Sequence, residues 1–293
     1  MCGFDPLYVI LPYFNYCKFK KRRTLFIEFV NRIARNPWIK IVVSEMGNDL
    51  PVLPVHVHHR IKPGHPIWIK ENLVNLAVER LPDTWRYMAW IDADITFLNR
   101  NWARETINEL KECDVVQMFQ SAINMGPEGE AIKLDNSFLH MYLTGGKYSK
   151  TDKYGHWHPG YAWAMTHKAW DRMGRLIDWA ILGSGDRHLA MALIGKVHDS
   201  YHNGVHPNYK SLLENFEKKC KGLNLGCVKG SIVHHWHGSL KNRRYRERWL
   251  ILVSNKYDPL VDVGLDKNGI LRLKSLRFED QLRDYFLGRE EDS

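Results

Sequence analysis

Short apolar runs alternate with amphipathic stretches through the first 119 residues, and this alternation constrains the fold more than any other feature. The apolar runs have the length of buried strands and lie at residues 7–11, 38–43, 87–91 and 115–119. The stretches between them carry apolar side chains at helical spacing, which predicts helices over residues 24–35, 69–80 and 102–112. Alternating strands and helices build a mostly parallel sheet covered on both faces. The sequence therefore predicts an α/β fold that binds its ligands beyond the carboxyl ends of the strands.

Other parts of the chain are less regular. Residues 51–66 hold four prolines and four histidines, and we expect them to be irregular. Residues 120–160 are rich in Gly, Lys, Asn and His, and an irregular stretch of that length is more often a functional lid than filler. Further strands are expected at residues 161–165 and 231–236, and further helices over residues 167–179, 186–194 and 242–254, the last of them very basic.

A chain of 293 residues has room for one large domain with a sizeable core. We expect a main domain over residues 1–254 and a C-terminal extension over residues 255–293 that packs on it. The five cysteines form no C-x-x-C pair and are odd in number, which argues against a disulfide scaffold and indicates a reducing compartment. No run of eighteen apolar residues is present, so no transmembrane segment is expected.

The charge balance favours anionic partners. Lys and Arg number 42 against 33 Asp and Glu, a formal net charge of +9. Nucleic acids, nucleotides, phosphorylated lipids and acidic membrane faces all fit such a balance. Charge alone does not choose among them.

Two carboxylates stand one residue apart directly after the third apolar run, in the segment 90–94. Asp92 and Asp94 can bring oxygens to one hard divalent cation beyond the edge of the sheet. The D-x-D pattern is short and arises by chance roughly once in a chain with this many aspartates, so a solvated turn is the plainer interpretation. Its position, where an α/β sheet presents its ligands, favours a metal site.

Three imidazoles fall within four residues, at His234, His235 and His237. On a regular strand His235 and His237 share one face, and His234 faces the opposite way. Imidazole with carboxylate suits Mn²⁺ or Zn²⁺ better than Mg²⁺. We expect His237 to be the third metal ligand, with His234 the alternative if a bulge exchanges the two faces. The plainer interpretation is a half-buried strand whose histidines bond to backbone.

Five cations follow the histidines, namely Lys241, Arg243, Arg244, Arg246 and Arg248. Arg or Lys next to a metal is a usual way to hold a diphosphate, and we expect Lys241 with Arg243 or Arg244 to do so. For at least half of the five, an ordinary basic helix face in solvent is the better explanation.

A further acid, Asp186, follows two glycines. Glycine lets the backbone approach a ligand closely. An aspartate at the start of a helix is either an N-cap, which is the commoner role, or a general base. The aromatic segment 156–163 has the composition of a platform for sugar rings, although Trp163 can equally belong to the core.

In their order along the chain, these motifs resemble those of nucleotide-sugar glycosyltransferases of the GT-A fold, and most of all the inverting β-1,4-galactosyltransferase-like families. The motifs are Pro-Tyr-Phe-Asn at 12–15, Lys70-x-Asn72-Leu73-x-Asn75, Trp-Ile-Asp-Ala-Asp at 90–94, Gly-Tyr-Ala-Trp at 160–163, Gly-Ser-Gly-Asp at 183–186 and His-His-Trp-His-Gly at 234–238. The similarity covers roughly residues 7–250.

The chain departs from that pattern at two places. The Gly-Glu-Asp-Asp cluster of the family is here Gly185-Asp186-Arg187, with one acid only. The segment from His235 through Gly238 to Lys241 looks like a metal and phosphate motif of retaining GT-A enzymes without its trailing Pro-Trp. A retaining enzyme is therefore the first alternative to an inverting one.

The resemblance implies a GT-A-like, Rossmann-like α/β/α sandwich and a metal-dependent hexosyl- or pentosyltransferase. A cation, Mn²⁺ or Mg²⁺, would be held by the D-x-D motif and a late histidine and would stabilise the departing nucleoside diphosphate. Asp186 would take the proton from a hydroxyl of a glycan or glycoconjugate acceptor. About residues 1–119 would bind the nucleotide sugar, and about residues 120–254 the acceptor. The residues expected around the donor are Pro12, Tyr13, Asn15, Glu45, Lys70, Asn75, Asp92, Ala93, Asp94, Gly160, Lys241, Arg243 and Arg244.

Two alternatives of other classes stay open. A nucleic-acid-binding protein without catalysis would use the basic helix and the aromatics. It explains the charge, but not the position of the D-x-D motif or the histidines, and we expect no nucleic acid partner. A metal-dependent hydrolase or nucleotidyltransferase uses the same kinds of ligand.

The absence of a membrane anchor favours a cytoplasmic enzyme of a bacterial type, or a virus-encoded one acting in the host cytosol.

Overall fold

The structure, a computed structural model, describes residues 5–146 and 157–293. Its centre is a seven-stranded sheet of order β11-β6-β10-β4-β1-β2-β3. The strands are β1 (Leu7–Phe14), β2 (Ile39–Met46), β3 (Val57–Ile61), β4 (Tyr87–Ile91), β6 (Val115–Gln117), β10 (Ala162–Thr166) and β11 (Leu225–Cys227). Strand β10 runs antiparallel to β4 and β6, whereas the other four pairs are parallel. The expected α/β fold with a mostly parallel central sheet is confirmed.

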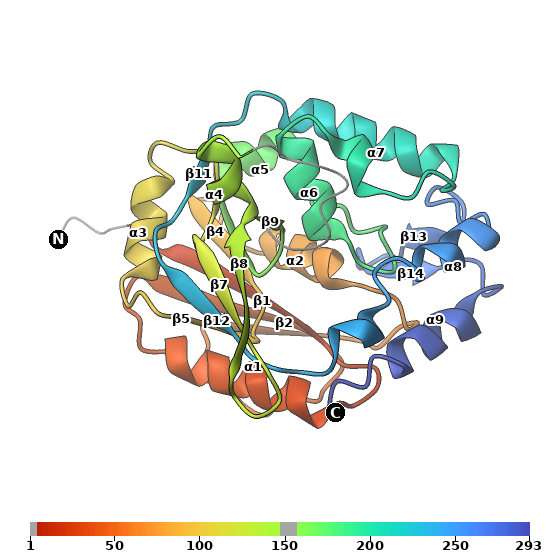
Figure 1. The fold of residues 1–293 in the computed structure, drawn as a ribbon, viewed down its shortest axis with the longest axis horizontal. Helices are drawn as coiled ribbons and strands as arrows, with labels where there is room; N and C mark the ends of the chain where they lie inside the picture. Colours follow the sequence, from red (N-terminus) through yellow and green to blue (C-terminus); the bar gives the residue numbers. More distant parts are fainter. Residues whose placement is uncertain (1–4, 147–156) are drawn as a thin grey trace.

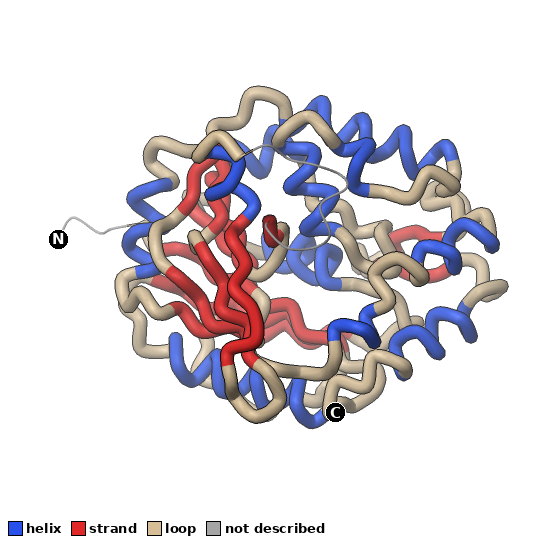
Figure 2. Tube along the Cα trace, in the orientation of Figure 1, coloured by secondary structure: helices blue, strands red, loops and turns tan. Residues whose placement is uncertain are grey.

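Helices cover both faces of this sheet, as Figures 1 and 2 show. On one face lie α1 (Lys20–Ile33) and α3 (Trp102–Glu109), and on the other α2 (Lys70–Val78), α5 (His167–Met173), α6 (Gly185–Leu193) and α7 (Pro207–Cys220). Successive side chains of a strand point to opposite faces, so Val9 of β1 packs in one core with Phe29, and Ile10 packs in the other with Leu73. Two apolar cores thus enclose the sheet.

A second sheet stands beside the first and has the order β5-β12-β7-β8-β9. Its strands are β5 (Ile95–Phe97), β7 (Ser121–Met125), β8 (Ala131–Ser137), β9 (Trp157–His158) and β12 (Ser231–His234). Residues 92–94 carry the chain from β4 of the central sheet into β5 of the second. Strand β12 pairs with both β5 and β7, which sets His234 opposite Ile95 and beside Asn124. The D-x-D segment and the late histidines therefore meet where the two sheets join.

The C-terminal residues add a small hairpin and a helix to one core. They form α8 (Trp249–Ser254), β13 (Val263–Leu265), β14 (Leu271–Leu273) and α9 (Glu279–Leu287). Phe278 and Tyr285 are 1% exposed and pack in the same core as α2. The Leu271 backbone N–H donates to the Asn72 side chain, which holds the hairpin against α2. The expected division at residues 119 and 254 stays a prediction.

Four expectations about local structure are wrong. Residues 121–143 form β7, β8 and α4 (Phe138–Leu143) rather than an irregular lid, because β7 pairs with β12, a strand more than a hundred residues away that leaves no local signal. Residues 57–61 form the edge strand β3, whose His58 and Arg60 point their polar side chains at Glu45 of β2. Residues 147–156, with the His156 of the aromatic segment, lie outside the described residues.

The expected basic helix over residues 242–254 is the third. A short 3-10 helix, η2 (Leu240–Arg243), is followed by Arg244, which adopts a left-handed conformation with φ of 46°, and α8 begins only at Trp249. Arg243 and Arg248 are 7% and 8% exposed, so they are turned inward rather than into solvent. The fourth wrong expectation is the helix over residues 167–179. Helix α5 stops at Met173 because Gly174 has a φ of +87°, although Thr166 caps the start of that helix as expected.

In the described part of the chain, no helix combines the length and the apolar character needed to cross a bilayer. The cysteines at positions 17, 113, 220 and 227 are free thiols. The expected cytoplasmic location stays a prediction.

Candidate functional site

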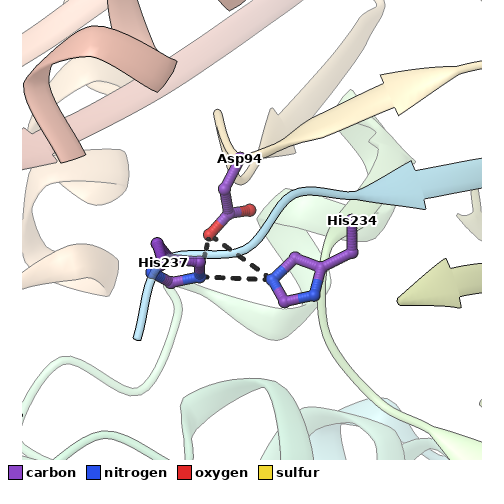
Figure 3. Close-up of side chains that lie close together, drawn as sticks. All are labelled: Asp94, His234 and His237. Carbon is purple, nitrogen blue, oxygen red and sulfur yellow. Dashed lines mark hydrogen bonds and ion pairs between the residues drawn. The ribbon is translucent and has the colours of Figure 1, made fainter. Parts of the chain in front are cut away.

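Asp94, His234 and His237 converge at the junction of the two sheets (Figure 3). The Nε2 atom of His237 lies 2.8 Å from Oδ2 of Asp94, and that of His234 lies 3.8 Å from the same oxygen. The two Nε2 atoms are 3.2 Å apart. One carboxylate and two imidazoles therefore offer one oxygen and two nitrogens within 4.8 Å of one another.

The end of β12 explains why both of these histidines face Asp94. The strand stops at His234, and the His235 backbone N–H donates to the Asp94 carbonyl (2.8 Å). The His235 ring turns to the Thr96 hydroxyl (2.7 Å), away from the cluster. Beyond it the chain bends at Gly238, where φ is +90° and a Cβ atom would stand 2.8 Å from the carbonyl oxygen of Glu290. The expectations that His235 shares a face with His237, and that His234 faces away, are wrong because the strand is already over.

The three side chains fit a divalent cation. Among the described residues, Oδ1 of Asp94 is buried and has no hydrogen-bond partner, which leaves one carboxylate oxygen available to a ligand. Burial opposes the charge of Asp94, but the two imidazoles outweigh it and hold the pKa well below its usual range. Burial lowers the pKa of His234. An ionised carboxylate and neutral imidazole are the forms that bind metals, and this donor set suits Mn²⁺ better than Mg²⁺.

Asp92 faces a different partner. Its Oδ1 lies 2.7 Å from Nζ of Lys70, a side chain of 5% exposure on α2. The same ammonium lies 2.9 Å from Oδ2 of Asp186. Burial would lower the pKa of Lys70, but Asp186 and Asp92 raise it above its ordinary value. Burial raises the pKa of Asp92 to about 6, although Lys70 acts in the opposite direction.

A buried glutamate that sequence reasoning missed stands behind this ion pair. Glu71 is 5% exposed, and burial raises its pKa to about 8. Its Oε1 would lie 2.2 Å from a Cβ atom at Gly185, so only glycine leaves room for the carboxylate there. Asp186 itself is the second residue of α6, after Ser184 at the cap position, so the N-cap interpretation of Asp186 is wrong. We call Lys70, Glu71, Asp92 and Asp186 the Lys70 cluster.

Gly160 and Tyr161 lie between the Lys70 cluster and the metal-binding residues, because they contact members of both groups. A Cβ atom at Gly160 would lie 3.4 Å from Oδ2 of Asp186. The Asp92 backbone N–H donates to the Tyr161 carbonyl (2.7 Å). Tyr161 in turn stacks on His158, with ring centroids 3.8 Å apart, and lies 4.7 Å from the ring of His234. Trp163 is fully buried, as its interpretation as a core residue expects.

Three arginines gather around one buried glutamate beside His237, and of these four residues the sequence predicted only Arg243 as part of the site. The Glu291 carboxylate is fully buried and accepts from both Arg22 (2.6 Å twice) and Arg289 (2.8 Å). Arg243 lies 3.4 Å from the same carboxylate and 2.7 Å from Nδ1 of His237. Burial opposes the charge of Glu291, but Arg22 and Arg289 hold its pKa well below the usual range. Arg22 and Glu291 are 269 positions apart, so no local pattern could have paired them.

The other expected donor residues are spread more widely. Pro12, Tyr13 and Asn15 lie at the carboxyl end of β1, where Tyr13 and Asn15 both donate to Asp49. Lys241 and Arg244 are exposed on and just after η2. Ala93 separates the two aspartates and is half-buried.

Two of the expected donor residues are occupied inside the protein. Glu45 is fully buried and accepts from the backbone N–H groups of Asp49 and Leu50. Asn75 is also fully buried and donates to Leu176 and Asp178. The structure brings these two side chains neither to the metal-binding residues nor into the Lys70 cluster. Roles in donor binding stay predictions for all of these residues.

No model of a protein family matches the chain, and no curated protein matches it either. A search of solved structures finds the catalytic domain of Drosophila beta1,4-galactosyltransferase 7 with xylobiose, at 10% identity and TM-score 0.45, over 95% of this chain and 99% of that one. A mutant of that protein, with manganese, UDP-Gal and xylobiose, is 11% identical with TM-score 0.43, over 94% and 98%. The 4-diphosphocytidyl-2C-methyl-D-erythritol synthase of Anaerococcus prevotii is 12% identical with TM-score 0.35, over 77% and 89%.

The first two structures carry the name of the galactosyltransferases that the sequence motifs resemble. At TM-scores of 0.45 and 0.43, the likeness assigns no residue role and no activity to this chain. The geometry of the site is the stronger guide to its chemistry.

Proposed function

We propose that this chain is a metal-dependent glycosyltransferase that moves a sugar from a nucleoside-diphosphate donor to a hydroxyl of a glycan or glycoconjugate. One observation carries the proposal: Asp94 and two imidazoles fit a divalent cation, and Asp92, the other acid of the same D-x-D motif, shares the Lys70 ammonium with Asp186. A metal site beside a separate carboxylate is what transfer to a hydroxyl needs, because one part binds the leaving group and the other receives the proton.

Asp94, His234 and His237 would hold the cation, with Mn²⁺ preferred over Mg²⁺ by the nitrogen ligands. Bound there, a divalent cation supplies Lewis-acid stabilisation of the diphosphate leaving group. Arg243 lies 2.7 Å from Nδ1 of His237 and would offer guanidinium charge to phosphate oxygens there. The exposed Lys241 and Arg244 provide further cations at its rim.

Asp186 would act as the general base. Its Oδ2 is held by the Lys70 ammonium at 2.9 Å, which orients the carboxylate. As the acceptor oxygen forms its bond to the anomeric carbon, the bond from that carbon to the diphosphate breaks and the hydroxyl proton passes to Asp186. Attack opposite the leaving group inverts the anomeric configuration.

The decisive experiment couples binding to product analysis. Thermal shift against a panel of nucleotide sugars, each with Mn²⁺ or with a chelator, should show stabilisation that needs both the nucleotide and the metal. Nuclear magnetic resonance of the product made with the stabilising donor should show the inverted anomer. Equal nucleotide affinity with and without metal would remove the Lewis-acid role, and a retained anomer would remove Asp186 as the base.

A further inference from the structure

The second ring nitrogen of His234 faces the side-chain amide of Asn124. In the parallel pairing of β7 and β12, Asn124 stands beside His234. Nδ1 of His234 lies 3.0 Å from Oδ1 of Asn124, which is 7% exposed. The Tyr161 hydroxyl donates to the same oxygen at 2.8 Å.

The orientation of the Asn124 amide is determined by its other end. Its Nδ2 donates to Oδ2 of Asp135 at 2.9 Å, and Asp135 also pairs with the Lys133 ammonium at 2.8 Å. An ionised carboxylate only accepts hydrogen bonds, so the amide must turn its NH₂ group to Asp135 and its oxygen to His234. An amide oxygen only accepts as well, so Nδ1 of His234 must carry the proton. The lone pair of His234 then lies on Nε2, the atom that faces Asp94 and His237.

The His237 ring has different partners. Its Nδ1 lies 2.7 Å from a guanidinium nitrogen of Arg243, which only donates. Its Nε2 lies 2.8 Å from Oδ2 of Asp94, 3.2 Å from Nε2 of His234 and 3.3 Å from the same guanidinium nitrogen, so these contacts do not single out one tautomer of His237. His234 is therefore the histidine whose tautomer its own partner fixes, with the lone pair pointing into the metal site.

We propose that Asn124 is a positioning residue that fixes His234 in the tautomer with Nε2 free, and that Asp135 fixes Asn124. The inference rests on the proposed function only in naming a divalent cation as the ligand that Nε2 receives. A carboxylate or amide behind a metal-binding histidine sets its tautomer and orientation, and loss of such a partner costs about 10–100-fold in metal affinity.

The first test uses Mn²⁺ alone, with calorimetry on the whole chain. Asn124→Leu removes the acceptor at similar size and should weaken Mn²⁺ binding by about 10–100-fold. Tyr161→Phe is the matched control, because it removes the other hydrogen bond to the same oxygen and leaves the one to His234 intact. It should stay within about threefold of the unmodified chain if the His234 bond carries the effect. Equal losses in both variants would reduce Asn124 to a structural role and overturn the proposal.

The second test reads the tautomer itself, without metal or donor. Long-range ¹H–¹⁵N spectra, with the His234 signals assigned from a His234→Gln variant, should show the proton on Nδ1 in the unmodified chain. Asp135→Asn is a milder change that replaces Asn124→Leu if the latter does not fold. In it the Asn124 amide is free to turn, and a mixture of His234 tautomers should appear. A proton on Nε2 of His234 in the unmodified chain overturns the proposal. If the spectra show Nδ1–H but Mn²⁺ does not bind, the proposed metal centre fails and the role of Asn124 in setting the tautomer stands.

Discussion

Asp92 and Asp94 belong to one short motif, yet the fold gives them opposite surroundings. Two imidazoles hold the pKa of Asp94 well below its usual range, whereas burial raises that of Asp92 to about 6. Asp94 faces side chains that can share a cation, and Asp92 faces an ammonium that it shares with Asp186. A D-x-D pattern therefore need not bring both carboxylates to one metal, because each carboxylate takes its function from the partner that the fold supplies.

Removal of the carboxylate proposed as the base tests the Lys70 cluster most strongly. Asp186→Asn keeps the size of the side chain but leaves no group there that accepts a proton at neutral pH. Turnover should fall by about 10²–10⁴-fold while donor affinity changes little, because the base acts in the transition state. Steady-state kinetics with donor-binding calorimetry measure both. A variant with lower stability and near-normal turnover would make Asp186 a structural residue.

The ammonium between the two carboxylates should matter for folding as well as for catalysis. Lys70→Met leaves Asp92 and Asp186, whose side chains are 27% and 21% exposed, near the buried Glu71 without their counter-charge. Loss of one partner of a fully buried ion pair costs about 3–5 kcal/mol, and we expect a loss at the lower end of that range. Urea unfolding measures this loss of free energy. Lys168→Met, on the exposed face of α5, is the control and should stay within about 0.5 kcal/mol. A loss below about 1 kcal/mol in Lys70→Met would mean that the cluster is far better solvated than its burial indicates.

The two aspartates can be separated by metal binding. Asp94→Asn removes a ligand and should weaken Mn²⁺ binding by more than about 100-fold, beyond the cost of losing a group behind a ligand. Asp92→Asn should leave Mn²⁺ affinity within about tenfold, since Asp92 pairs with Lys70 in this structure. Calorimetry with Mn²⁺ decides between them. Equal losses would show that the metal draws Asp92 away from Lys70 and that the contrast between the two residues holds only without metal.

The smallest expected effect is a pH dependence of stability that comes from His188, a residue of the helix that carries Asp186. His188, two residues beyond Asp186 on α6, is fully buried between Ser200 (2.7 Å) and Tyr209 (2.9 Å). Burial lowers its pKa from 6.5 to about 3. Below pH 6.5 the unfolded chain takes up a proton that the folded chain does not, so the free energy of unfolding falls as the pH falls toward 3. This group should contribute a loss of about 2 kcal/mol between pH 6.5 and 5.

Chemical denaturation at the two pH values measures that loss, and His188→Asn is the comparison. The variant leaves a cavity and should be less stable at both pH values. Its loss of unfolding free energy between pH 6.5 and 5 should, however, be smaller than that of the unmodified chain by about 2 kcal/mol. An identical pH dependence in both chains would mean that His188 accepts a proton in the folded state.

The sequence alone determined the frame of the molecule. The strand–helix alternation through residue 119 predicts β1, β2, β4 and the helices between them, because side-chain periodicity follows directly from local backbone geometry. It also places the D-x-D segment at the carboxyl end of β4. The late histidines lie in or directly after the strand predicted over residues 231–236, and His234 and His237 meet Asp94.

Tertiary structure decided which partner each of these residues meets. Asp92 turned to Lys70, His235 to Thr96 and Arg243 to His237, none of which follows from spacing. Strands β7 and β8 escaped prediction because β7 pairs with β12, more than a hundred residues away. Glu291 reached Arg22 across 269 positions. Periodicity records only how a residue sits relative to its neighbours in the chain, whereas the charge of a buried group and the tautomer of a histidine depend on groups that the fold brings from elsewhere.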